Sequence, residues 1–170
     1  MIKTSRLTLI PCTLEIFEAL DKGREHLALR LKARIPENWP LFPESISYFH
    51  EPLKVDPELL GWGTWLVVLE ESRTLIGEGG YGGKPGAGGQ VEIGYGIMPE
   101  QRGKGFATEF AQALIDHAWE DKRVTQIEAG TLKSGDDAMA SMRVLEKLGF
   151  VRSKETEESL RWALPRSGAK

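Results

Sequence analysis

The residues whose types and spacing most clearly indicate chemistry form one short turn, RGKG at positions 102–105. An alternating apolar stretch, residues 91–98, leads into this turn, and a long amphipathic stretch follows it as far as Asp121. A strand, a glycine turn and a helix in this order bring successive backbone N–H groups to one point, where the helix adds the positive end of its dipole. Such a turn binds anions, and pyrophosphate is its usual ligand.

Two known phosphate-binding motifs match this turn poorly. A P-loop requires a hydroxyl residue after its lysine, whereas Lys104 is followed by Gly105. A dinucleotide-binding fingerprint requires a third glycine where Thr108 stands, and a position after the first strand of a parallel sheet. A glycine turn that holds no ligand is the remaining alternative.

The elements that must position the turn predict an α/β fold. Period-two patterns with glycine or proline boundaries indicate strands at residues 6–10, 64–70, 74–81, 91–98, 126–131, 150–151 and 160–164. Apolar residues at helical spacing indicate helices behind a Thr13 cap, weakly at 26–33, between the turn and Asp121, and at 137–148 before Gly149. Consecutive strands joined by short turns favour an antiparallel meander. We therefore expect one domain over residues 1–170, with a mixed, mainly antiparallel twisted sheet and helices on both faces.

The stretch from residue 35 to residue 63 is the hardest to interpret, because five prolines interrupt it. Short helices are predicted around 45–50 and 57–60. The stretch also carries several aromatic residues, which makes it too apolar for a disordered linker. We expect it to cover the core and to shape a pocket together with the glycine-rich loop 82–89.

Composition and charge restrict the possible partners. The net charge is −3, with 41% apolar and 28% charged residues, so broad attraction to nucleic acid or anionic lipid is not expected. A cationic second substrate is mildly favoured. The single cysteine, Cys12, excludes an intramolecular disulfide, and its position at a strand end suggests packing rather than nucleophilic chemistry. No stretch resembles a signal peptide or a membrane span, so we expect a cytoplasmic protein.

Histidine offers no catalytic or metal-binding pattern. The three histidines, His26, His50 and His117, are scattered without the spacing of metal ligands, and we predict no metal site. No Ser-His-Asp or Cys-His arrangement can be recognised.

Three segments resemble the GNAT superfamily of N-acetyltransferases. RGKGFA at 102–107 matches the [Q/R]-x-x-G-x-[G/A] signature, and ASMRVLEKLGF at 140–150 resembles the A-S-x-x-V-L-E-K-x-G-F segment. TSRLTL at 4–9 looks like the T-x-R-L-x-L start of the RimJ/RimL-type branch. The segments occur in the expected order, and only residues 34–61 lie outside the resemblance. It implies a GNAT-like fold with splayed central strands and acetyl-CoA as co-substrate.

By this resemblance the glycine turn holds the pyrophosphate of acetyl-CoA. Its glycines let backbone N–H groups approach the phosphates closely. Main-chain groups of Ile97 and Met98 would pair with the pantetheine arm, and an N–H there could stabilise the oxyanion of the thioester carbonyl. The predicted cofactor-binding residues are Ile97, Met98, Arg102, Gly103, Lys104, Gly105, Phe106, Ala107 and Thr108.

Direct acetyl transfer to an amine needs a general base, because a primary amine is largely protonated at neutral pH. We predict Glu92, which interrupts an otherwise apolar strand and resembles the Glu of the branch's E-[I/L]-G-Y segment; its alternative is a solvent-facing edge residue paired with a cation. Glu78 is the second candidate. Ser141 could donate a hydrogen bond to the departing thiolate, or else serve only in packing. The family often has Asn where Ala138 stands, which puts one cofactor contact in question.

The sequence thus predicts an acetyl-CoA-dependent N-acetyltransferase that acts without an acyl-enzyme. The acceptor is a primary amine, either a protein N-terminus or a small molecule, and a homodimer is left open. The competing hypothesis is a CoA-binding regulatory or interaction module without catalysis.

Overall fold

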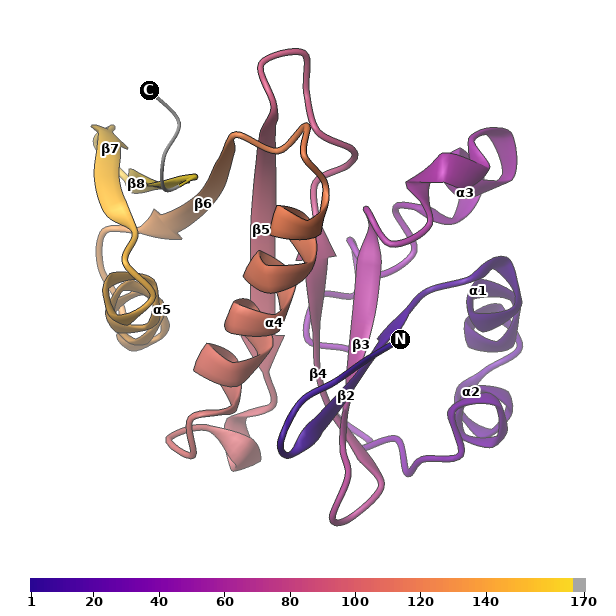
Figure 1. Ribbon diagram of the computed structural model, residues 1–170. Coiled ribbons are helices and arrows are strands. Elements are labelled where there is room, and N and C mark those ends of the chain that lie inside the picture. The colour runs from indigo at the N-terminus through magenta and orange to yellow at the C-terminus, as the bar shows by residue number, and fades with distance from the viewer. Residues whose placement is uncertain (167–170) are drawn as a thin grey trace.

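The computed structural model describes residues 1–166, which form one eight-stranded sheet flanked by helices (Figure 1). The strands are β1 (Ile2–Lys3), β2 (Leu7–Pro11), β3 (Thr64–Leu69), β4 (Thr74–Tyr81), β5 (Gln90–Ile97), β6 (Gln126–Leu132), β7 (Val151–Glu155) and β8 (Ser159–Pro165). The α-helices are α1 (Leu14–Asp21), α2 (Arg24–Leu31), α3 (His50–Val55), α4 (Phe106–Glu120) and α5 (Asp136–Lys147). Two short 3₁₀ helices are η1 (Pro57–Leu59) and η2 (Pro99–Gln101).

The sheet has the strand order β1-β2-β3-β4-β5-β6-β8-β7. Each neighbouring pair is antiparallel except β5 and β6, which are parallel. This parallel pair requires a crossover, and α4 supplies it. The predicted mixed, mainly antiparallel sheet is therefore confirmed.

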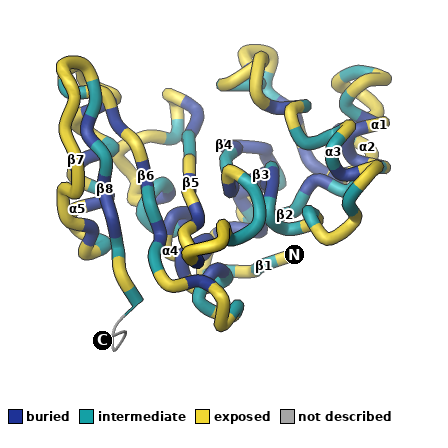
Figure 2. The backbone as a smooth tube through the Cα atoms, turned by 90° about the horizontal axis from the view of Figure 1, so that it is seen from above, coloured by how far each residue is buried: buried dark blue, intermediate teal, exposed yellow. Residues whose placement is uncertain are grey.

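Apolar side chains fill both sides of the central strands. In β3, Trp65 and Val67 join the cluster that includes residues of α4 and α5, whereas Leu66 and Val68 join the cluster of α1 and α2. This division follows from the period-two alternation of a strand. Figure 1 shows α1 to α3 gathered on the opposite side of the molecule from α5, and Figure 2 shows the buried central strands in dark blue and the exposed strand β7 in yellow. Helices on both faces of the sheet are confirmed.

Local signals explain most element boundaries. The Thr13 hydroxyl accepts from the Ile16 N–H and caps α1, as predicted. Gly149 follows α5 with a φ of 86°, a left-handed value that favours glycine.

The stretch of many prolines agrees with its prediction at η1, where a short helix was expected around 57–60, and differs from it before that point. The helix predicted around 45–50 begins only at His50 and continues to Val55. Pro52 lies in the first turn of this helix, where its missing N–H has no intrahelical partner to lose. The prediction was wrong here because proline was taken as a break. Among residues 1–166, no helix combines the length and apolar character needed to cross a membrane.

Candidate functional site

A gap between β5 and β6 forms the centre of the candidate site. The two strands pair at only three positions, and the last pair is Glu92 with Glu128. Beyond that pair β5 continues to Ile97, whereas β6 turns away and pairs with β8 (Figure 1). The edge of β5 that faces the gap therefore has no strand partner along its second half.

The backbone groups of β5 alternate between its two edges. Met98 donates its N–H to the Ile76 carbonyl, and Gly82 donates to the Glu92 carbonyl, so the even-numbered residues face β4. Tyr95 and Ile97 consequently face the gap. The N–H of Met98 is used within the sheet, and the role of Met98 as a cofactor-binding residue stays a prediction. Ile97 keeps a position at the gap, although its carbonyl accepts from Arg102 Nε at 3.1 Å.

The glycine turn lies at the open end of this gap. Gly103 and Gly105 have φ values of 74° and 82°, which side-chain-bearing residues rarely adopt. Gly105 also occupies the N-cap of α4, where no side chain caps the helix. Among residues 1–166, the backbone N–H groups of residues 103–108 make no hydrogen bond, and the next N–H, of Glu109, donates to the Gly105 carbonyl. These consecutive donors are what an anion-binding turn requires.

The two cations of the turn are engaged by neighbouring groups. Arg102 Nη1 lies 2.6 Å from Asp137 Oδ1, which ties the turn to the start of α5 across the gap. Lys104 Nζ donates to the Glu100 carbonyl and to Gln101 Oε1. The turn therefore offers backbone donors first and side-chain charge second. Phe106 is buried beneath it, and Ala107 and Thr108 are half-buried in the first turn of α4.

Glu92 does not lie in an apolar environment. Val91 and Ile93 are buried on the α4 side of β5, so the alternating Glu92 side chain points to the other, open face and is 47% exposed. Arg161 of β8 binds both of its oxygens, at 2.8 and 2.9 Å. This is the alternative that the sequence left open, a solvent-facing glutamate paired with a cation.

Glu78 has the environment that the sequence assigned to Glu92. It is 2% exposed on β4, in register with Gly96 of β5. Its Oε1 accepts from the Phe42 N–H at 2.7 Å, whereas Oε2 is buried and makes no hydrogen bond to any of residues 1–166. Burial raises the pKa of Glu78, although the donors of Phe42, Leu41 and Trp39 act in the opposite direction. A carboxyl group in this state can accept a proton from a substrate.

Two glycines of β5, Gly94 and Gly96, lie on the face of the sheet that carries Glu78. A Cβ atom on Gly96 would meet the ring of Phe42, which comes from the cover segment, residues 36–46. A Cβ atom on Gly94 would meet nothing within 4 Å, and this residue is exposed. The open strip at Gly94 thus lies between Glu92 on one side and Phe42 with Glu78 on the other.

On the opposite face of β5, Tyr95 reaches across the gap toward α5. Its hydroxyl donates to the Ser141 carbonyl over a long 3.4 Å contact. Burial raises the pKa of Tyr95, so the hydroxyl keeps its proton. Ser141 itself is half-buried, and its own hydroxyl makes no hydrogen bond within the described part of the chain. The sequence interpretation missed Tyr95, although its odd-numbered position beside Ile97 places it at the gap.

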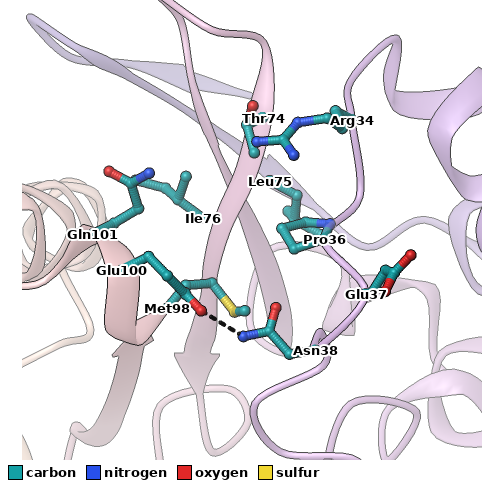
Figure 3. Close-up of a pocket in the computed structure, with 10 residues that line it drawn as sticks. All are labelled: Arg34, Pro36, Glu37, Asn38, Thr74, Leu75, Ile76, Met98, Glu100 and Gln101. Carbon is teal, nitrogen blue, oxygen red and sulfur yellow. Dashed lines mark hydrogen bonds between the residues drawn. The ribbon is translucent and has the colours of Figure 1, made fainter.

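A cavity of about 240 Å³ lies where β5 ends, between the start of the cover segment and η2 (Figure 3). Leu75, Ile76 and Met98 line it, and the Asn38 amide donates to Glu100 Oε1 at 2.8 Å. Figure 3 shows this bond as a dashed line. It connects the cover segment to the residues that lead into the glycine turn.

Cys12, His50 and His117, to which the sequence analysis gave no catalytic role, are packed against other residues. Cys12 is buried, and burial followed by the charge of Glu78 raises the pKa of its thiol. His50 stacks on Phe17, and His117 packs against Trp65. Within residues 1–166, no group of three or more His, Cys, Asp or Glu side chains could hold a metal ion.

Comparisons with known proteins agree with this geometry. Residues 6–151 match the family described as the acetyltransferase (GNAT) domain. The uncharacterized N-acetyltransferase YjdG of Bacillus subtilis is 31% identical over 165 residues, which are 95% of this chain and 96% of YjdG.

Solved structures extend the likeness at the level of the fold. The ribosomal-protein-S5-alanine acetyltransferase of Vibrio fischeri superimposes with a TM-score of 0.69 at 18% identity, over 99% of this chain and 98% of that one. The dodecameric spermidine N-acetyltransferase of Vibrio cholerae gives 0.65 at 19% identity, over 96% of each chain.

Proposed function

This chain belongs to the GNAT family of acetyltransferases, and we propose that it transfers an acetyl group from acetyl-CoA to a primary amine by direct attack of the amine on the thioester. The observation that carries the proposal is the row of unpaired N–H groups at residues 103–108, at the open end of the β5–β6 gap. Acetyl-CoA is the donor general to the family. The motif TSRLTL at 4–9 supports placement in the RimJ/RimL-like branch.

The residues of the gap fit a phosphorylated, amide-bearing ligand. The N–H groups of residues 103–108 would bind its pyrophosphate, with the helix dipole of α4 behind them. Tyr95 and Ile97 would offer main-chain groups to the amides of its arm. A backbone N–H of this edge would also stabilise the oxyanion that forms when the amine attacks.

Glu78 is our proposed general base, ahead of Glu92. Deprotonation of the attacking ammonium requires an acceptor whose pKa lies near the working pH. Burial moves the pKa of Glu78 in this direction, and Oε2, which makes no hydrogen bond within the described residues 1–166, is available to accept a proton directly or through water. Glu92 has both oxygens bound by Arg161, so it would have to leave an ion pair first.

The leaving thiolate would be stabilised from the other side of the gap. The Tyr95 hydroxyl makes only a long bond to the Ser141 carbonyl, so it could turn to a sulfur atom at little cost. We propose Tyr95 as the donor and keep Ser141 as the second candidate. The acceptor amine would enter over Gly94, beneath the cover segment.

The acceptor itself is proposed only as a class. Relatives of the same fold are named for the alanine of a ribosomal protein and for spermidine, which are a polypeptide α-amine and a polyamine. Either presents a primary amine that is cationic in solution, which fits the net charge of −3 of this chain. Assembly as a homodimer stays a prediction.

Mixing the protein with acetyl-CoA and a panel of N-terminal peptides, polyamines and amino acids, while free thiol is measured, tests the proposal. We expect thiol release that depends on one class of amine, with the acetylated product seen by mass spectrometry. Binding of acetyl-CoA without thiol release for any amine would instead support the non-catalytic module.

A further inference from the structure

The turn between β1 and β2, at residues 4–6, packs against the start of α4 and the glycine turn. Thr4 Oγ1, Ser5 Oγ and the Arg6 N–H all donate to Glu109 Oε1, at 2.6, 3.0 and 2.9 Å. Arg6 Nε and Nη2 both lie 2.7 Å from Glu109 Oε2. Glu109 is in the first turn of α4, so the N-terminal segment is fastened to the helix end that the proposed pyrophosphate would approach.

Arg6 also contacts the glycine turn itself. Its Nη1 donates to the Lys104 carbonyl at 2.9 Å. Its guanidinium carbon lies 4.4 Å from the centre of the Phe106 ring, and a Cβ atom on Gly105 would come 3.4 Å from Nη2. One side chain thus contacts Lys104, Phe106 and Glu109 and lies beside the Cβ position of Gly105.

These contacts fix the direction of a backbone donor. The Lys104 carbonyl and the Gly105 N–H belong to one planar trans peptide, and they point in opposite directions. Because Arg6 binds the carbonyl, the Gly105 N–H points away from Arg6. The two flanking glycines have little conformational restraint of their own, so a bond to this peptide restricts the turn more than it would restrict a turn of other residues.

The Arg6 guanidinium also compensates the negative charge of Glu109. A carboxylate in the first turn stabilises a helix but repels an incoming phosphate. Partial burial raises the pKa of Glu109, yet the hydrogen bonds from Thr4, Arg6 and Ser5 outweigh burial and lower it, so the group is ionised. Arg6 provides the positive charge that balances it.

We propose that Arg6 is a positioning residue for the acetyl donor: it orients the peptide of the glycine turn and neutralises Glu109, so that residues 103–108 can bind pyrophosphate. The inference rests on the proposed function and adds to it the part played by the N-terminal motif. Arg6 touches the turn rather than the reacting atoms, so its loss affects donor binding and leaves the chemical step unchanged.

The chain contains a matched control for Arg6. Arg73 pairs with Glu70 at 2.8 Å and donates to the Leu31 and Lys32 carbonyls, so it too binds one carboxylate and backbone oxygens. Its side chain is 43% exposed, against 45% for Arg6. Arg73 lies at the β3–β4 turn and fastens it to the end of α2, and within residues 1–166 its side chain makes no hydrogen bond or ion pair to residues 102–109.

The test compares Arg6→Gln with Arg73→Gln, using CoA binding by calorimetry and turnover with two donors. One donor is acetyl-CoA, and the other is S-acetylpantetheine, which lacks the pyrophosphate. We expect Arg6→Gln to weaken CoA binding by about 10- to 100-fold, the effect of one misplaced charge-assisted hydrogen bond. KM for acetyl-CoA should rise with kcat preserved, and turnover of S-acetylpantetheine should stay at the wild-type level. Arg6→Lys, which keeps the charge, should restore part of the affinity.

Each other outcome has a distinct meaning. If Arg6→Gln and Arg73→Gln alter CoA binding equally, or if Arg6→Gln slows both donors equally, the role of Arg6 is only structural and the inference is overturned. Unchanged CoA affinity in Arg6→Gln also overturns it while leaving the proposed function intact. Failure of the wild-type protein to bind CoA overturns the proposed function and this inference with it.

Discussion

Glu92 and Glu128 face each other on the last pair of residues that β5 and β6 share before the strands separate. Like charges at directly opposed positions of a sheet are destabilising. Arg161 of β8 lies against both, with Nη1 at 2.8 Å from Glu92 Oε1 and Nη2 at 3.5 Å from Glu128 Oε2. The guanidinium therefore holds the two strands together where the gap begins.

Replacement of this arginine should weaken the sheet at that point. We expect Arg161→Gln to lower the free energy of unfolding by about 1 kcal/mol, since the groups are partly exposed and solvent screens their repulsion. Urea denaturation gives the value. The double variant Arg161→Gln with Glu92→Gln should recover part of the loss, because one of the facing charges is then gone. Strictly additive losses would contradict the pairing.

Glu78→Gln separates the two candidate bases. Loss of a general base costs about 10²- to 10⁴-fold in rate, so kcat should fall by that range while CoA binding is unchanged. In the wild-type enzyme kcat should rise with pH through a value above that of an ordinary glutamate, because burial raises the pKa of Glu78. Glu92→Gln should retain kcat close to the wild-type value. The reverse result, a loss in Glu92→Gln alone, would assign the base to Glu92.

Glu78 should also make stability depend on pH. Its folded-state pKa lies above its unfolded value, so the folded protein holds the proton more tightly. The stability that this proton contributes is complete below the unfolded pKa and is lost as pH rises through the folded pKa. Relative to wild type, Glu78→Gln should therefore gain stability between about pH 4 and neutral pH. Urea denaturation at both ends of this window measures the gain, and a constant difference would contradict it.

Tyr95→Phe tests the proposed thiolate donor. A hydrogen bond to a charged group contributes about 1.5–3 kcal/mol, so kcat should fall by about 10- to 100-fold. Stability should change little, because the existing bond to the Ser141 carbonyl is long. Ser141→Ala is the companion variant, with the rate measured by thiol release. A loss in Ser141→Ala but not in Tyr95→Phe would transfer the role to Ser141.

Gly105→Glu should abolish CoA binding by placing a side chain and a negative charge at the anion site. Gly23→Glu is its control, since Gly23 is the N-cap of α2 and has a left-handed φ of 109° with nothing near its Cβ position. Both variants place the same charge at a helix N-terminus. Gly23, with a ψ of 174°, lies in a backbone region that is essentially restricted to glycine, whereas Gly105, with a ψ of 3°, lies in the left-handed helical region. We expect Gly23→Glu to lose at least as much melting temperature as Gly105→Glu, with CoA affinity lost only in Gly105→Glu. Equal CoA affinity in both would exclude the glycine turn as the pyrophosphate site.

The glycine turn and the sheet were predictable because their signals are local. Period-two patterns mark the strands, and glycine at 103 and 105 marks left-handed backbone. No local signal could decide between Glu78 and Glu92 as the buried glutamate. Both lie in strands rich in apolar residues and glycine. The buried glutamate, Glu78, accepts from the Phe42 N–H, which lies 36 positions before it in the chain. That contact belongs to the segment of many prolines, whose path no periodic pattern describes.

The neighbours of Tyr95 could not be predicted from local signals either. Its alternation on β5 was readable, yet its proximity to Ser141 depends on how far β6 and α5 swing away from β5. The pairing of β5 with β6 stops after Glu92 and Glu128, and no local pattern of the sequence marks that point. Sequence patterns therefore located the glycine turn and left the choice of candidate catalytic side chains ambiguous.

Gly94 offers the most direct test of where the acceptor enters. Its backbone is not left-handed and its Cβ position is empty, so Gly94→Val should fold with at most a small loss of stability. The new side chain would stand on the face of β5 that carries Glu92, in the strip leading to Glu78, because residues two apart on a strand share a face. It would not face the glycine turn or the main-chain groups of Ile97. We therefore expect KM for the amine to rise steeply while CoA affinity, measured by calorimetry, stays unchanged. An unaltered amine KM would place the acceptor elsewhere, and a parallel loss of CoA affinity would mean that β5 itself had shifted.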